Sequence, residues 1–500
     1  MFNWFLQAFL SWLAVCLFVV PLSVGAVVEG KRPNVLFVIT DDQSWAHAGA
    51  YGDRGVKTPA FDRIAKEGVL FEHAFCAAPS CTPSRNAILT GQAIWRLAEG
   101  GLLLSTLPDK YAVFPELLAN AGYETAYTGK SWGPGNWRAG GRLKHPVGKA
   151  YQTHKLKRPR PGMSNIDYAA NFEAFLNERD EAKPFMFWYG SSEPHLGYAK
   201  GQGLKAGKKL QDAHLFDCFP DNDTFRSEVL DYYVEIEHAD SHLERIVALL
   251  EERGELEDTL IIATGDHGIP LGRSKCNLYD SGTRVPLAIR FPSRFPGQRT
   301  VSDFVSLTDL APTILEFVGL PIPKEMTGRS LVGLLTSGRE GRIESLRDRV
   351  ITAFERHTWC RPEGVGYPMR ALRTDQFLYI RNYEPSRWPA GDPTYQAKPQ
   401  GPFGDIDRSI TKSFLMANKD HPDVTFYFEL AMGKRPPEEL YDISTDPGQI
   451  HNLARDAHYL EIKNLLASEL EQYLLNTGDP RQSGVTPWDE YLYTGAKAEE

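Results

Sequence analysis

The chain has 500 residues, of which 42% are hydrophobic and 24% are charged, a composition typical of a globular protein with a sizeable core. This length accommodates one large α/β domain and a smaller one. The net charge of −9 argues against a general nucleic-acid-binding protein, although local basic clusters stay compatible with a polyanionic substrate.

The first 26 residues predict a secretory signal peptide. Residues 5–24 are essentially uncharged, and the small side chains of Val24-Gly25-Ala26 suit signal-peptidase cleavage. The alternative is a retained membrane anchor, because the apolar run approaches the ~20 residues that span a bilayer. Pro21 and the small residues after it favour cleavage. We therefore expect a secreted or periplasmic protein, lysosomal in an animal host, without stable membrane insertion after cleavage.

Residues 27–345 predict one α/β domain, because strands alternate with helices along this part of the chain. Such an alternation is typical of a large, mostly parallel sheet that is covered by helices on both faces. The run 34–40 (N-V-L-F-V-I-T) is continuously apolar, as in a strand buried on both faces. The predicted strands are 34–40, 123–129, 184–190 and 259–264, and the predicted helices are 58–68, 84–91, 114–122 and 228–253.

Polar side chains follow all four of these strands. The chain places Asp41 and Asp42 after the first strand, Lys130 after the second, His195 after the third, and Asp266 and His267 after the fourth. Ligand sites of parallel sheets gather at the carboxyl ends of the strands. We therefore expect these side chains to meet at one edge of the sheet.

Residues 346–500 predict a smaller C-terminal α+β subdomain. The segment 384–407 is rich in proline, glycine and aromatic residues, which favours an ordered surface loop. The predicted strands here are 350–354, 369–372, 377–381 and 439–441, and 459–475 is the predicted closing helix.

After signal cleavage five cysteines remain: Cys76, Cys81, Cys218, Cys276 and Cys360. An odd number in an exported protein leaves one unpaired, and this number is too small for a disulfide scaffold. How the others pair stays open at this point.

One of these cysteines carries the most specific pattern in the chain. Cys81-Thr82-Pro83-Ser84-Arg85 is followed by Leu89-Thr90-Gly91, which together match C-x-P-S-R-x-x-x-L-T-G in full. The chain thus resembles the sulfatase family, in which a maturation enzyme converts this cysteine to formylglycine and the hydrated aldehyde supplies the attacking oxygen. A helix that starts near Ser84 would direct free N–H groups at residue 81, and Arg85 would add a cation. The alternative is a structural cysteine before a helix.

The same resemblance implies a metal site. Asp41, Asp42, Asp266 and His267, together with the residue derived from Cys81, are similar to the family's metal ligands. Adjacent carboxylates repel each other unless a cation lies between them, and oxygen ligands suit Ca²⁺ or Mg²⁺. Many family members have Asn in place of His267, while others, including the iduronate-sulfatase type, have His. The nitrogen ligand of a histidine leaves room for a divalent ion other than Ca²⁺. We expect Ca²⁺; a helix cap or a solvated turn is the alternative for the Asp41-Asp42 pair.

Lys130, His195 and Lys275 match the family's sulfate-binding and acid–base positions. Lysines can neutralise sulfate oxygens in the transition state, and a histidine can protonate the leaving group. Arg273 and Arg284 are alternative cations.

The chain departs from the family at Trp132, where the family usually has a histidine that contacts the formylglycine hydroxyl. His47 and His154 are the candidates that could compensate for it.

Weaker motifs resemble the heparan N-sulfatase type and imply a sulfated saccharide as substrate. They include Gly268-Ile269-Pro270 and Tyr367-Pro368-Met369-Arg370. Phosphate or phosphonate monoester hydrolysis and non-catalytic binding of a sulfated glycan are the alternative functions. Four residues are candidates for sugar recognition: Arg356, His357, Arg361 and Arg370.

Overall fold

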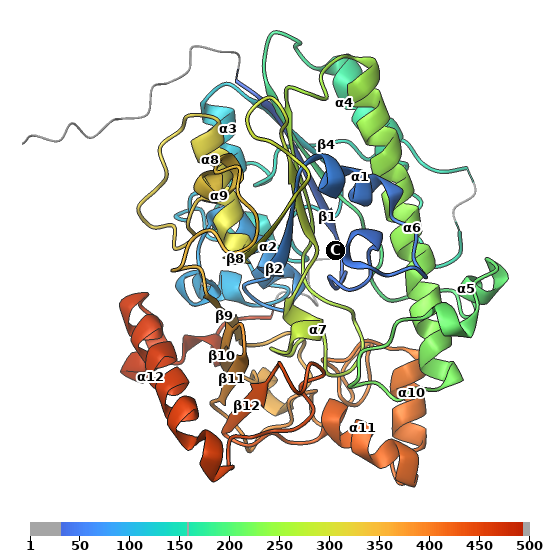
Figure 1. Cartoon of the computed structure of the whole chain (residues 1–500), viewed down its shortest axis with the longest axis vertical. Helices are drawn as coiled ribbons and strands as arrows, with labels where there is room; N and C mark the ends of the chain where they lie inside the picture. Colours follow the sequence, from blue (N-terminus) through green and yellow to red (C-terminus); the bar gives the residue numbers. More distant parts are fainter. Residues whose placement is uncertain (1–31, 158–159, 494–500) are drawn as a thin grey trace, which may run out of the picture. The chain divides into compact units, whose positions relative to one another are not determined.

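The computed structural model describes residues 32–157 and 160–493 (Figure 1). The predicted signal peptide lies outside these residues. Within the described part, no helix combines the length and the apolar character that a bilayer span requires.

An eight-stranded sheet forms the framework, in the order β4-β3-β5-β1-β6-β7-β2-β8. Neighbouring strands are parallel except where β7 pairs antiparallel with β6 and with β2. The predicted large, mostly parallel sheet is therefore confirmed. Its strands are β1 (Asn34–Thr40), β2 (Val69–Phe75), β3 (Glu124–Gly129), β4 (Lys149–Ala150), β5 (Phe185–Gly190), β6 (Thr259–Gly265), β7 (Leu287–Arg290) and β8 (Arg299–Ser306).

Helices bury both faces of this sheet, which explains the continuous apolar run of β1. Val35 and Phe37 face a core shared with α2, α3, α8 and α9, while Leu36 and Val38 face a core shared with α1, α4 and α6. The helices of this region are α1 (Pro59–Glu67), α2 (Cys81–Thr90), α3 (Phe114–Asn120), α4 (Tyr168–Glu178), α5 (Gln202–Lys205), α6 (Asp223–Glu252), α7 (Asp280–Thr283), α8 (Leu310–Phe317) and α9 (Val332–Thr336).

A second, antiparallel sheet follows in the order β12-β11-β10-β9. Its core side chains share a cluster with α12 and with Ala77 and Ala87, on either side of residue 81. The Ala353 backbone N–H also donates to the Ala77 carbonyl (3.0 Å), so this sheet supports the start of α2. The elements are β9 (Arg349–Phe354), β10 (Met369–Thr374), β11 (Phe377–Asn382), β12 (Glu438–Asp442), α10 (Ile410–Ala417), α11 (Pro422–Met432) and α12 (Leu460–Asn476). The domain boundary at residue 345 stays a prediction.

The described cysteines are all buried and free of disulfide bonds. The stability of this part of the chain therefore rests on its packed cores.

Candidate functional site

Four neighbouring strands bring the predicted residues together. β3, β5, β1 and β6 are adjacent and parallel, so their carboxyl ends lie at one edge of the sheet. The residues that meet there are Asp41, Asp42, Cys81, Arg85, Lys130, His195, Asp266, His267 and Lys275, here called the Cys81 site.

Residue 81 is the first residue of α2, which begins three residues earlier than predicted. Pro83 is compatible with this start, because N–H groups in the first turn of a helix have no intrahelical acceptor. The N–H that proline lacks therefore costs no hydrogen bond there. The expectation that free N–H groups of a helix starting at Ser84 point back at residue 81 is therefore wrong. Cys81 is 2% exposed, and burial raises the pKa of its thiol even though Lys130 partly offsets the shift. Unmodified Cys81 is thus a protonated thiol and a poor nucleophile.

Asp41 pairs with two cations. The Lys130 ammonium donates to both carboxylate oxygens at 2.6 and 2.5 Å, and Arg85 Nη2 lies 3.7 Å from Oδ1. Burial alone would raise the pKa of Asp41, but Lys130, together with His195 and Arg85, holds this pKa well below its usual value. Asp41 is therefore ionised.

Asp42 has a left-handed backbone conformation, with φ of 71°, which a non-glycine residue adopts only when its surroundings enforce it. Its backbone N–H donates to Asp266 Oδ1 at 2.9 Å. Its Oδ2 accepts from the Lys275 ammonium at 2.9 Å. Its Oδ1 is 3.1 Å from His267 Nε2 but has no hydrogen bond of acceptable geometry.

The Cys81 site fits a divalent cation. The ligand atoms of Asp41, Asp42, Cys81 and His267 all lie within 4.8 Å of one another. The unpaired Asp42 Oδ1 is a buried carboxylate oxygen that a cation would satisfy.

Asp266 stands outside that group of four. Its Oδ1 accepts the backbone N–H groups of Asp42 and His267, each at 2.9 Å, and its Oδ2 accepts from Arg85 Nε at 2.9 Å. These contacts hold the neighbouring residues in place, and the predicted role of Asp266 as a metal ligand stays a prediction.

Lys275 contacts a residue that sequence reasoning missed. Its ammonium donates to Asp407 Oδ2 at 2.9 Å and lies 3.2 Å from His195 Nε2. Asp407 belongs to the segment 384–407, so the interpretation of this whole segment as a surface loop is wrong: Asp405 and Asp407 are both buried. All five residues from Phe403 to Asp407 are buried, so no alternation of exposed and buried positions in the sequence could have indicated this.

Two side chains form the solvent-facing side of the Cys81 site. The side chain of His195 is 36% exposed and that of Lys130 is 18% exposed, whereas Asp41, Asp42, Arg85, His267 and Lys275 are buried. The Cys81 site is therefore open to solvent on the side of His195 and Lys130.

Arg273 and Arg284, the alternative candidates for the sulfate-binding cations, contact residues of the protein outside the Cys81 site. Arg273 donates to the Leu430 carbonyl and stacks on Tyr279. Arg284 donates to the Glu72 carbonyl and lies over Trp45.

Neither histidine proposed to compensate for Trp132 contacts the Cys81 site. His47 is packed among His214, Phe216, Tyr232 and Tyr233, and burial lowers its pKa to about 3. His154 is exposed and its backbone bonds to Asn171.

The Trp132 indole N–H donates to Asn86 Oδ1. The imidazole beside residue 81 is that of His267, whose Nε2 is 3.4 Å from Cys81 Sγ.

The three arginines predicted for sugar recognition are buried and bond within the protein. Arg361 pairs with Asp405, Arg370 pairs with Asp479, and Arg356 donates to the Gly364 carbonyl. His357 does reach residue 81 indirectly, because its Nδ1 is 2.8 Å from the hydroxyl of Ser80. The arginines therefore stabilise the fold through these contacts, and their role in sugar recognition stays a prediction.

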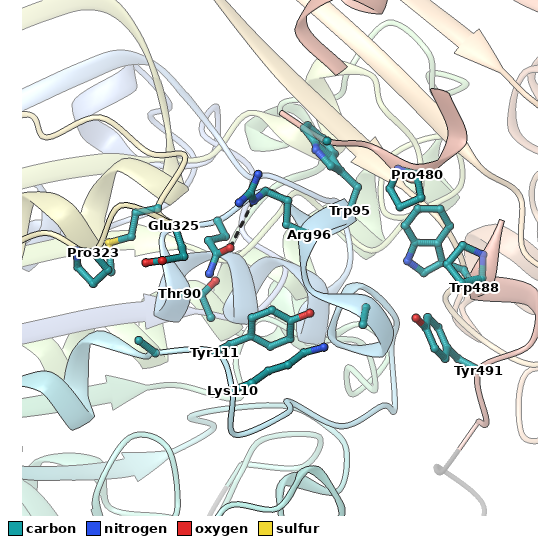
Figure 2. A pocket seen from close by; sticks show the side chains of 16 residues that line it. Thr90, Trp95, Arg96, Lys110, Tyr111, Pro323, Glu325, Pro480, Trp488 and Tyr491 are labelled. Atoms are coloured by element: carbon teal, nitrogen blue, oxygen red, sulfur yellow. Dashed lines mark hydrogen bonds between the residues drawn. The ribbon is translucent and has the colours of Figure 1, made fainter. Parts of the chain in front are cut away.

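A separate cavity of about 580 Å³ lies at the other end of α2, beside Thr90 (Figure 2). Figure 2 shows Trp488 and Tyr491 across from Tyr111 and Lys110. No residue of the Cys81 site lines this cavity. The cavity and the Cys81 site are therefore separate.

Residues 33–320 match the family model described as Sulfatase, and residues 265–392 match the model described as N-sulphoglucosamine sulphohydrolase, C-terminal. An ulvan-active sulfatase of Formosa agariphila is 27% identical over 94% of this chain and 79% of its own length. The human N-sulphoglucosamine sulphohydrolase is 27% identical over 92% of this chain and 93% of its own. The structure of BT4656 in complex with its substrate D-glucosamine-2-N,6-O-disulfate has the same fold, with a TM-score of 0.65 and 20% identity over 90% of this chain and 99% of that chain.

Proposed function

Because this chain belongs to the sulfatase family, we propose that it removes a sulfate group from a sulfated saccharide at the Cys81 site. The relatives named for ulvan and for N-sulphoglucosamine support a sulfated sugar as substrate. Release of sulfate from glucosamine N-sulfate or from glucosamine 6-O-sulfate distinguishes a sulfate bound to nitrogen from one bound to oxygen.

We propose that a maturation enzyme converts Cys81 to formylglycine, and that a divalent cation, Ca²⁺ in our proposal, binds beside it. The hydrated aldehyde would supply the attacking hydroxyl oxygen, and the cation would stabilise negative charge on that oxygen and on the sulfate. Asp41, Asp42 and His267 would hold the cation, with Asp266 as a further ligand. The protonated, buried thiol supports this proposal, because it makes unmodified Cys81 unsuited to the attack.

Among the cationic residues, Lys130 binds the sulfate and stabilises the transition state. Burial lowers the pKa of Lys130, but Asp41 outweighs this effect and keeps the ammonium charged, and it lies on the open side of the site. Arg85 is held by Asp266 and by the carbonyl oxygens of Lys130 and Ser131, so it orients its neighbours rather than the substrate. Fixed cations of this kind stabilise charge that develops in the transition state.

His195 is the proposed proton donor to the leaving group. Its Nδ1 is 2.9 Å from the Leu196 carbonyl, which can only accept, so Nδ1 carries a hydrogen and Nε2 accepts from the Lys275 ammonium. Nε2 would therefore receive from Lys275 the proton that it gives to the departing saccharide oxygen. The exposed side of this ring is where a saccharide oxygen would arrive.

The observation that supports the proposal most is the clustering of Asp41, Asp42, Cys81 and His267 within 4.8 Å, beside Lys130 and Lys275. The test measures free sulfate released from glucosamine N-sulfate, glucosamine 6-O-sulfate and 4-nitrophenyl sulfate, with 4-nitrophenyl phosphate as the rival substrate and Cys81→Ala as the control. We expect sulfate release by the protein and none by Cys81→Ala. Faster phosphate release, or saccharide binding without turnover when residue 81 is converted, would contradict the proposal.

We further propose that residues 1–26 direct export and are removed. Sequencing the N-terminus of the protein purified from its native host tests this, and an intact Met1 terminus would contradict it.

A further inference from the structure

We infer that Asp407 is a positioning residue for the reaction, because it holds the Lys275 ammonium between Asp42 and His195. This inference rests on the proposed function, in which Lys275 and His195 act on the departing saccharide oxygen. Nothing in the family motifs that the chain carries includes Asp407.

The contacts of Lys275 account for its whole donor capacity. An ammonium has three N–H groups. Its three partners are Asp42 Oδ2 at 2.9 Å, Asp407 Oδ2 at 2.9 Å and His195 Nε2 at 3.2 Å. Asp42 also serves as a proposed cation ligand and His195 as the proposed proton donor. Of the three partners, Asp407 is therefore the one that has no other proposed role in the reaction.

Charge balance gives a second reason. Lys275 is 2% exposed, and a buried ammonium needs carboxylate partners, which Asp42 and Asp407 supply at 2.9 Å each. Without Asp407, the single carboxylate of Asp42 would have to serve both a buried ammonium and a divalent cation. Lys275 would then shift toward Asp42 and away from His195, or would leave its place.

The other carboxylate oxygen of Asp407, which Lys275 does not contact, is held by the loop that carries it. Gln400 Nε2 donates to Asp407 Oδ1 at 3.0 Å. The buried ammonium of Lys412, in α10, donates to the carbonyl oxygens of Gln400, Phe403 and Ile406 at 3.1, 3.0 and 2.7 Å. A lysine that binds three carbonyls of one loop fixes the path of that loop, so the segment 400–407 delivers Asp407 to the site in a defined place.

The alternative is that Asp407 only ties its loop to the sheet. In that case its loss would lower stability, but it would not change how the rate depends on the leaving group. The two roles are therefore separable by comparing phenyl sulfate with 4-nitrophenyl sulfate, whose leaving group needs less help from a proton donor.

The test variant is Asp407→Asn, which keeps the size and one acceptor oxygen but removes the charge. The matched control is Asp479→Asn, which removes a buried carboxylate paired with Arg370, away from the Cys81 site. We expect kcat/KM of Asp407→Asn to fall about 10- to 100-fold with phenyl sulfate and less than about fivefold with 4-nitrophenyl sulfate. The control should lose thermal stability yet keep kcat/KM with both substrates. An equal loss on both substrates, or no loss, would overturn the inference.

A crystal structure of Asp407→Asn separates this inference from the proposed function. We expect the Lys275 ammonium to lose its contact with either Asp42 or His195. If the parent protein releases no sulfate, the proposed function fails, while a displaced Lys275 still supports the positioning role. An undisplaced Lys275 would overturn the inference whatever the activity.

Discussion

At the scale of single residues, Arg85 joins three parts of the Cys81 site. It is fully buried, and its guanidinium bonds to Asp266 and to the carbonyl oxygens of Lys130 and Ser131. Lysine keeps the charge but cannot reproduce this fork of donors. We therefore expect Arg85→Lys to lower the free energy of unfolding by about 2–3 kcal/mol and to reduce turnover strongly.

Urea unfolding and sulfate release measure these two effects. The matched control is Arg342→Lys, because Arg342 Nη2 donates to both carboxylate oxygens of Asp375 at the surface. Such an exposed pair should change the free energy of unfolding by less than about 1 kcal/mol. An Arg85→Lys variant as stable and active as this control would contradict the role assigned to Arg85.

Trp132 raises the question of what replaces the histidine usual in the family. Because its indole N–H is committed to Asn86, we expect Trp132 to support α2 and not to transfer a proton. Trp132→Phe should lower the free energy of unfolding by about 1–3 kcal/mol, since it leaves a buried acceptor unpaired, and should keep turnover within about tenfold. Loss of turnover in a folded Trp132→Phe variant would show that the indole takes part in the chemistry.

At the scale of elements, the strands that carry the site could be predicted from sequence. The apolar runs of β1, β5 and β6 and the polar residues that follow them indicate both the sheet and the edge where Asp41, His195 and Asp266 lie. Helix α2 begins three residues before the predicted start at Ser84, because proline is tolerated within the first turn and Pro83 therefore does not exclude the earlier start.

Asp407 could not be placed from sequence for a different reason. Its position depends on the loop path set by Lys412 and on a contact with Lys275, 132 residues away, and neither leaves a local pattern. Long-range contacts between irregular segments are set by packing, whereas strands and helices show in the periodicity of nearby residues.

The contact between α1 and α6 gives a pH prediction. Both oxygens of Asp240, in α6, accept backbone N–H groups at the start of α1, from Ala60 and Phe61 at 2.9 Å each. Burial raises the pKa of Asp240 from 3.8 to about 7. Between these values the unfolded chain has lost this proton and the folded chain keeps it, so stability falls as the pH rises through this window.

Asp240→Asn cannot titrate at this position, and the other groups titrate in both proteins. We therefore expect the parent to lose stability relative to the variant as the pH rises from about 4 to about 7. Urea unfolding of both proteins at several pH values measures this difference. A difference that stays constant across the window would refute the raised pKa.

At the scale of the whole molecule, the Cys81 site and its neighbour Asp407 connect parts of the chain that belong to both sheets. Asp41 and Asp42 follow a strand of the eight-stranded sheet, residue 81 begins a helix supported by Ala353 of β9, and Asp407 comes from the loop between β11 and α10. The acidic groups at the site are held close together, so a bound cation should stabilise the folded chain as well as the reaction.

Removal of metal tests this coupling. We expect a chelator to abolish sulfate release and to lower the melting temperature, and Ca²⁺ to restore both. Asp42→Asn should make the melting temperature far less sensitive to the chelator. A parent protein whose melting temperature and turnover are unchanged after complete metal removal would exclude the proposed cation.

The most direct measurement is the mass of the peptide that contains residue 81, taken from protein with measured sulfate release. Conversion of the thiol to the aldehyde exchanges sulfur and two hydrogens for one oxygen, so this peptide should be about 18 Da lighter than its sequence predicts. The converted fraction should rise in proportion to turnover across preparations. Full turnover from protein that carries only the unmodified thiol at residue 81 would contradict the account.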